Sequence, residues 1–159
     1  MVQITALPED ALLQVYAQQP DCYTDCFSAT VPRDVDLPEF TTAFYSGWLF
    51  GLERMILKLV ANRPSTTADI AALASGETDK FAAWSVEGRE PGQILLCDMH
   101  GRTRSWLCVA PEGANTRVYF GSAVTPPPGE SDLGFVFKSL LRFHKLYSRA
   151  LLSAATRAL

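Results

Sequence analysis

The sequence lacks the patterns that mark several large classes of protein. No apolar run reaches the length of a membrane span, and residues 1–13 carry Glu9 and Asp10 but no basic residue, unlike a secretory signal. We therefore expect a cytoplasmic protein with no transmembrane segment. A phosphate-binding loop, a dinucleotide fingerprint, a Gly-x-Ser-x-Gly turn and a His-Glu-x-x-His helix are also missing, so the sequence predicts no cofactor.

Positive charge and metal-binding side chains are scarce as well. The 14 Lys and Arg residues against 17 Asp and Glu residues give a net charge of −3, which argues against a general nucleic-acid-binding surface. Among the four cysteines, Cys22 and Cys26 fall on one predicted strand, roughly 13 Å apart at about 3.3 Å per residue. That separation is too large for a bond or for shared chelation, so we expect reduced thiols and no metal site.

The composition is that of an ordinary globular domain. The chain has 159 residues, of which 48% are apolar, 11% aromatic and 19% charged. This length is enough to bury a core without disulfide bonds. We expect a single domain over residues 1–159.

Helical patterns frame the first half of the chain. Pro8 and the acids after it predict a helix over residues 8–18, and an aromatic and β-branched run predicts a strand over 22–31. Asp36 caps a helix that is kinked at Ser46 and Gly47 and ends before residue 64. A second helix follows from residue 65 to 74, with Gly76 just past its end.

Four strand-like runs and one long helix make up the second half, at residues 81–87, 93–99, 102–110, 116–124 and 132–158. If residues 100 and 101 form a two-residue turn, Cys97 pairs with Arg104 and Leu95 with Trp106. Apolar residues then occur on both faces of this hairpin, so we expect the sheet to be covered on both sides.

This order predicts an α+β fold in which an antiparallel sheet grips a long C-terminal helix, with two consecutive helices after the first strand. The order, the hairpin ILLCDMHGRTRSWL at 94–107 and the ending LGFVFKSLLRFHKLYSR at 133–149 resemble a bacterial family without assigned chemistry, allied to the START-like, polyketide-cyclase-like helix-grip superfamily. The resemblance implies an apolar ligand between sheet and helix. It carries over no catalytic residue, and the full helix grip has seven strands where we count five.

Our first functional hypothesis is a module that binds a small apolar molecule in a cavity between the sheet and the last helix. Large aromatic side chains and two polar ones are its candidate ligand-binding residues: Phe44, Trp84, Arg104, Trp106, Tyr119, Phe137, His144 and Tyr147. The same aromatic residues equally suit a packed core.

A second hypothesis is an enzyme of cyclase, dehydratase or hydrolase type on the same scaffold. Its acid or base is His144 on the apolar stripe of the last helix, or Asp98 with His100 near the hairpin turn. The alternatives are a structural histidine in the core and a solvated turn.

A basic stripe on the last helix supports a third hypothesis, an interaction protein whose binding weakens with salt. Its members are Lys138, Arg142, Lys145, Arg149 and Arg157. A solvated helix face that complements the helix dipole explains them equally well. The sequence leaves open whether the protein forms a homodimer.

Overall fold

A computed structural model describes residues 1–47 and 66–159 of the chain. These residues form one antiparallel sheet with helices on both of its faces. The strands are β1 Gln3–Ile4, β2 Tyr23–Val31, β3 Lys80–Phe81, β4 Trp84–Glu90, β5 Gln93–Asp98, β6 Thr103–Glu112 and β7 Asn115–Val124. The helices are α1 Gln14–Ala17, α2 Leu37–Ser46, α4 Thr67–Ser75 and α5 Phe135–Ala158.

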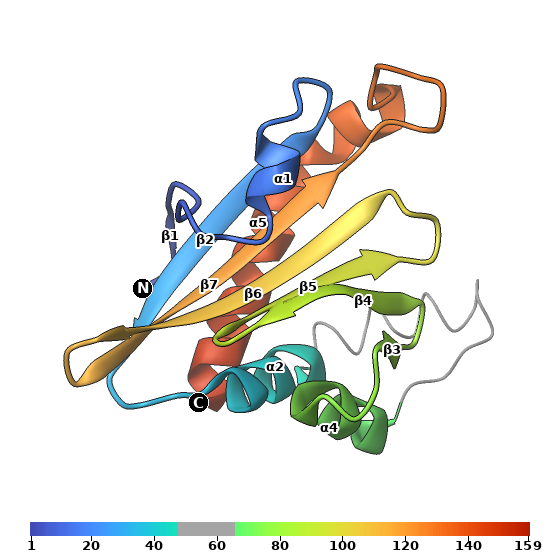
Figure 1. The fold of residues 1–159 in the computed structure, drawn as a ribbon. Helices are drawn as coiled ribbons and strands as arrows, with labels where there is room; N and C mark the ends of the chain where they lie inside the picture. The colour runs from blue at the N-terminus through green and yellow to red at the C-terminus, as the bar shows by residue number, and fades with distance from the viewer. Residues whose placement is uncertain (48–65) are drawn as a thin grey trace.

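The sheet has the strand order β1-β2-β7-β6-β5-β4-β3, so the first long strand pairs with the last one. The chain then leaves β7 and returns as α5, which crosses one face of the sheet, while α2 and α4 lie side by side near the end of α5 (Figure 1). The predicted α+β helix grip, with two consecutive helices between the first strand and the rest, is confirmed.

Several element bounds differ from those predicted. The sheet has seven strands rather than five, because β1 and β3 are only two residues long and leave no periodic signal. The helix expected over residues 8–18 is reduced to the single turn of α1, and α5 begins at Phe135 rather than at residue 132. The continuation expected for α2 beyond Gly47 lies outside the described residues.

Local signals explain the helix ends and the hairpin register. The Asp36 side chain accepts a hydrogen bond from the Glu39 amide at 2.8 Å and so begins α2. Helix α4 ends at Gly76, whose φ of 82° favours glycine. In the hairpin, Cys97 faces Arg104 and Leu95 faces Trp106, as predicted.

The core facing α5 is apolar and buried over part of its length. Phe44 on α2 and Phe120 on β7 bring their ring centroids to 4.7 Å, and Leu152 on α5 is completely buried beside them. We call this region the closed end of the sheet–α5 interface; it comprises Phe27, Phe40, Phe44, Phe120 and Leu152. It lies toward the carboxyl end of β2, where Arg33 donates a hydrogen bond to the Leu159 carbonyl at 2.8 Å.

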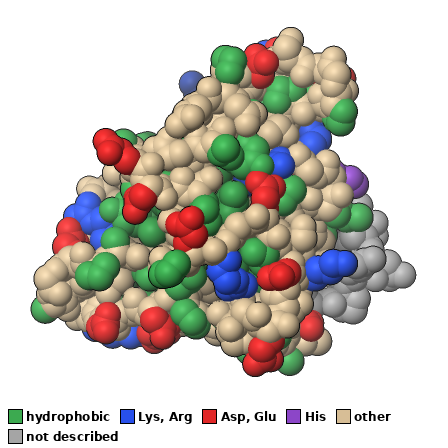
Figure 2. All heavy atoms as spheres, viewed as in Figure 1, with side chains coloured by type: hydrophobic (Ala, Val, Ile, Leu, Met, Phe, Trp, Pro, Cys, Tyr) green, Lys and Arg blue, Asp and Glu red, His purple; other side chains and the backbone are tan. Residues whose placement is uncertain are grey.

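The opposite face of the sheet is covered by the N-terminal segment, and Figure 2 shows this side of the molecule, where acidic side chains lie among hydrophobic ones. Leu13 and Trp106 are completely buried there. Their close approach requires Gly121 on β7, because a Cβ at that position would lie 2.8 Å from Leu13 Cδ2 and 3.0 Å from Trp106 Cε3. The expectation that both faces are covered is confirmed.

Candidate functional site

Three elements bring polar side chains together at the other end of the sheet–α5 interface. Asp25 on β2 lies directly opposite Ser122 on β7, and His144 reaches both from α5. The distance from His144 Nε2 is 2.9 Å to Ser122 Oγ and 3.4 Å to Asp25 Oδ2. The Asp25 side chain is 7% exposed and that of His144 is 25% exposed, so this end is partly open to solvent. We call it the open end; it comprises Tyr23, Asp25, Ser122, Phe137 and His144.

The carboxylate of Asp25 is the centre of this cluster. Its Oδ1 accepts hydrogen bonds from the Ser122 hydroxyl at 2.6 Å and the Ser122 amide at 3.2 Å, and its Oδ2 accepts one from the Tyr23 hydroxyl at 2.8 Å. Burial raises the pKa of Asp25, but the hydrogen bonds from His144 and Ser122 outweigh it and hold the pKa below its ordinary value. Asp25 is therefore ionised at neutral pH.

The hydrogen-bond pattern also assigns the proton on His144. A serine hydroxyl has one proton, and that of Ser122 is directed to Asp25, so Ser122 Oγ accepts a hydrogen bond from His144 Nε2. Nε2 thus carries the proton of the neutral ring. The other ring nitrogen, Nδ1, has no hydrogen-bond partner among the residues that the structure describes. In the neutral ring it is a free acceptor.

Two aromatic rings lie beside this histidine. The ring of Tyr23 lies edge-on to His144, with the ring centroids 5.9 Å apart, and Phe137 lies 6.2 Å from His144 and 5.3 Å from Tyr23. The ammonium group of Lys145 is 5.9 Å from the centre of the Tyr23 ring. The open end therefore combines apolar surface, a ring nitrogen that is unpaired among the described residues, and a nearby positive charge.

The predicted acid and base candidates differ in their surroundings. His144 faces the sheet, as expected, and its hydrogen-bonding partners there are Ser122 and Asp25. The predicted pair of Asp98 with His100 is not formed. Asp98 accepts hydrogen bonds from the amides of Arg102 and Thr103 at 2.7 and 3.0 Å, because it closes the turn, whereas His100 is exposed at the tip.

Five of the eight candidate ligand-binding residues lie on α5 or on the side of the sheet that α5 covers, but they are spread over a wide area. Phe137 and His144 are neighbours, but Phe44 belongs to the closed end, and Tyr147 lies farther along α5 against the same core. Trp84 is four strands away from β2, about 19 Å at roughly 4.8 Å per strand. Its buried indole N–H has no hydrogen-bond partner in the described part of the chain, and a pocket of about 190 Å³ adjoins it.

The remaining three candidates lie on the opposite face of the sheet, which corrects the grouping of all eight around one cavity. Trp106 and Tyr119 pack with the N-terminal segment, and the Arg104 guanidinium lies 4.5 Å from the centre of the Tyr16 ring. Arg104 also pairs with Glu87 at 3.2 Å. Strand alternation separates the two faces, but it does not say which of them the last helix covers, so the sequence allowed either.

Asp25 and Ser122 are functional candidates that the sequence analysis did not identify. An aspartate within an aromatic and β-branched strand is itself a signal, since its charge does not suit a buried sheet face. Its partner is 97 residues away, and only the pairing of β2 with β7 brings them together.

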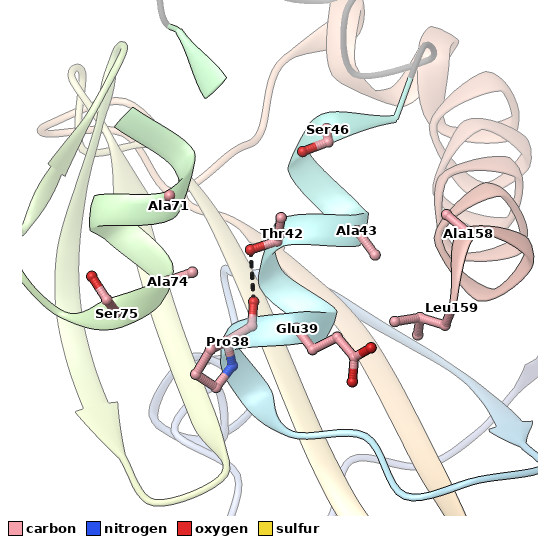
Figure 3. A pocket seen from close by; sticks show the side chains of 10 residues that line it. All are labelled: Pro38, Glu39, Thr42, Ala43, Ser46, Ala71, Ala74, Ser75, Ala158 and Leu159. Atoms are coloured by element: carbon pink, nitrogen blue, oxygen red, sulfur yellow. Dashed lines mark hydrogen bonds between the residues drawn. The ribbon is translucent and has the colours of Figure 1, made fainter. Parts of the chain in front are cut away.

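A groove between α2, α4 and the C-terminal residues is a second candidate (Figure 3). It has a volume of about 430 Å³ and is lined by Pro38, Glu39, Thr42, Ala43, Ser46, Ala71, Ala74, Ser75, Ala158 and Leu159. Glu39 is the one ionisable side chain in this lining, and both of its oxygens accept hydrogen bonds from Arg33. The groove therefore offers space and apolar surface, and among the described residues that line it no side chain is free for acid or base chemistry.

Metal ligands and membrane-spanning helices were sought in the described residues. No group of three or more His, Cys, Asp and Glu side chains that would hold a metal ion is found among them. Cys22, Cys26, Cys97 and Cys108 are free thiols. Within the same residues, no helix is both long enough and apolar enough to cross a bilayer.

Comparison with solved structures gives a likeness in fold, whereas comparison by sequence gives none. No family model matches the chain, and no curated protein matches it in sequence. Among solved structures, the chain is similar to the crystal structure of CalU16 from Micromonospora echinospora, with 10% sequence identity and a TM-score of 0.36. The alignment covers 99% of this chain and 92% of CalU16. At this level of similarity the fold rests on the strand order and the position of α5 described above.

Proposed function

We propose that the protein binds a small, largely apolar molecule at the open end of the sheet–α5 interface, with His144 as its polar contact. The observation that carries this proposal is a partly exposed histidine beside two aromatic rings, held through Nε2 by Ser122 and Asp25, whose Nδ1 has no hydrogen-bond partner among the described residues. Binding sites commonly combine apolar walls with a few fixed polar groups in this way.

The fold and the contrast with the closed end support the same proposal. The side chains of the closed end are apolar and buried, whereas the open end retains a buried carboxylate whose hydrogen bonds orient a neighbouring ring. We also propose that the protein is related to the polyketide-cyclase-like branch of the START-like superfamily. Such a relationship would agree with ligand binding. The single domain, the cytoplasmic location and the absence of a cofactor stay predictions, and a homodimer stays an open possibility.

A fluorescence titration with 1-anilinonaphthalene-8-sulfonate, which brightens on apolar surfaces, tests the site. We expect His144→Ala to weaken binding about tenfold, the effect of one hydrogen bond to a charged or polar group. Tyr119→Ala is the matched control, because Tyr119 is a half-buried ring on the opposite face. If Tyr119→Ala weakens binding and His144→Ala does not, the binding site is on the other side of the sheet.

The identity of the ligand calls for a separate measurement. Mass spectrometry of the freshly purified protein, first native and then denatured, reports any small molecule that leaves on unfolding. A released apolar compound supports the proposal and gives its chemical class. A native mass equal to that of the chain alone, together with no binding of the fluorescent probe, contradicts it.

Proton transfer by His144 is a second candidate function, and the assigned tautomer favours it. With Nε2 held by Ser122 and Asp25, Nδ1 is placed to take a proton from a bound substrate. A hydrolase with Ser122 as nucleophile fits less well, because Ser122 and Asp25 share one nitrogen instead of flanking the ring. Nitrogen-15 spectra of the imidazole provide the test: a proton on Nδ1 in the neutral ring excludes the role of base.

A further inference from the structure

The face of α5 turned away from the sheet carries large apolar side chains in contact with solvent. Phe135 is 84% exposed, and Phe143 and Leu146 are each 66% exposed. Phe135 and Leu146 are 11 residues apart, close to three helical turns, so they lie on one line along α5, roughly 16 Å long at about 1.5 Å per residue. Phe143 lies one turn from Leu146 on the same side. Such a stripe is unusual on a surface that faces only water.

Basic side chains run beside this stripe. Lys138, Arg142, Lys145 and Arg149 follow one another at spacings of four, three and four residues, so they share one side of α5. Within the described residues, neither Arg142 nor Arg149 forms an ion pair. Arg149 also lines a hollow of about 630 Å³ next to Leu146, together with Arg157 and the fully exposed Met1.

The charge of the chain is divided between α5 and the rest. Helix α5 holds five basic residues and no acidic one, and because the whole chain carries −3, the other residues carry −8. The face turned away from α5 displays acidic side chains, with basic ones among them (Figure 2). An anionic surface would therefore attract the side of the molecule that bears α5 and repel the opposite side.

We propose that the outer face of α5 docks on the surface of an anionic lipid bilayer. Phe135, Phe143 and Leu146 enter the region between headgroups and acyl chains, while the arginines contact lipid phosphates. Helices that lie in the membrane interface have this combination of aromatic or leucine side chains and basic flanks. The proposal is independent of the ligand site, since His144 points from the opposite side of α5 toward the sheet.

Co-sedimentation with lipid vesicles tests this docking. We expect the full chain to bind vesicles of phosphatidylcholine with about one third phosphatidylglycerol, and to bind pure phosphatidylcholine vesicles much less. Raising the salt concentration from about 0.05 to 0.5 M shortens the screening length and should release the protein. Equal binding to both vesicle types, or binding that is insensitive to salt, overturns the proposal.

Paired substitutions separate the charge from the apolar contact. Arg142→Gln with Arg149→Gln should weaken binding to anionic vesicles about 30-fold, given roughly fivefold for each basic residue near the surface. Phe143→Ser with Leu146→Ser should weaken it about tenfold. These side chains point outward, so thermal unfolding should stay unchanged.

The control variant places one apolar and one basic substitution away from α5. Val15, which is 57% exposed, and the exposed Lys80 serve for this purpose as Val15→Ser with Lys80→Gln. The control variant should bind vesicles like the wild type, and a loss of binding equal to that of the α5 variants contradicts the assigned face. Sedimentation equilibrium gives a further check. Suppose that the wild type does not bind vesicles but forms a dimer, and that Phe143→Ser with Leu146→Ser abolishes this dimer. This face of α5 would then contact a second copy of the chain, and the membrane proposal would be overturned.

Discussion

The closed and open ends of the sheet–α5 interface both receive residues from β2, β7 and α5, but their side-chain chemistry is opposite. At the closed end, Phe27, Phe120 and Leu152 are at most 5% exposed and make apolar contacts. At the open end, Asp25 and His144 form a hydrogen-bonded cluster with partial access to solvent. One pair of strands and one helix thus provide two different environments along their length.

This difference suggests that the closed end stabilises the fold, whereas the open end is available for binding. Apolar burial contributes about 25 cal/mol for each Å² removed from water, so the closed end accounts for much of the folding free energy of this interface. The cost of desolvating a carboxylate such as Asp25 largely offsets its hydrogen bonds, and apolar replacements of similar clusters are often as stable. Folding alone does not require a polar cluster at the open end.

Removing one phenyl ring from each end should give the largest contrast. Phe40→Ala at the closed end, where the side chain is fully buried, should lower the free energy of unfolding by about 3–5 kcal/mol. Phe137→Ala at the half-exposed open end should cost about 1 kcal/mol, because less apolar area is lost. Urea denaturation measures both values. Equal losses would contradict the division of the interface into two environments.

Substituting Asp25 tests whether the polar cluster is a connected unit. In the wild type, the Asp25 carboxylate accepts three hydrogen bonds, two from Ser122 and one from Tyr23. Asp25→Asn removes its charge and should lower the free energy of unfolding by about 1–3 kcal/mol. The control is Asp132→Asn. The Asp132 side chain is 60% exposed, and its partner Lys138 also lies on the surface. Exposed pairs of this kind contribute little, so that variant should unfold within about 0.5 kcal/mol of the wild type.

The stability difference between the wild type and Asp25→Asn should also depend on pH. The pKa of Asp25 is lower in the folded state than its ordinary value of about 3.9, so the ionised group stabilises the fold above that pH. This contribution is lost as the pH falls from about 4 through the lower folded pKa. The difference in unfolding free energy between wild type and Asp25→Asn should therefore shrink in this range. A difference that stays constant down to pH 2 would show that Asp25 does not act through its charge.

The sequence predicts the arrangement of elements better than it predicts the site. Alternation along the strands placed Leu96 and Leu107 on one face and Trp106 on the other, and the turn fixed the register of the hairpin. Which face α5 covers depends on the crossing from β7, and that crossing has no local signal. For the same reason, His144 was identified from its place on an apolar stripe, whereas its partners Asp25 and Ser122 depend on strand pairing over a long sequence separation.

The smallest change separates the hydrogen bonds of the open end from its aromatic surface. Tyr23→Phe removes the hydroxyl that donates to Asp25 at 2.8 Å but leaves the ring beside His144 and Phe137. Asp25 keeps its two hydrogen bonds from Ser122, so the loss of unfolding free energy should be about 0.5–1.5 kcal/mol. If the ring is the binding surface, the affinity for 1-anilinonaphthalene-8-sulfonate should remain within about twofold of the wild-type value, because apolar contact depends on area rather than on the hydroxyl. An affinity as low as that of His144→Ala would instead mean that the orientation of Asp25 and His144 determines binding, and that the aromatic walls contribute little.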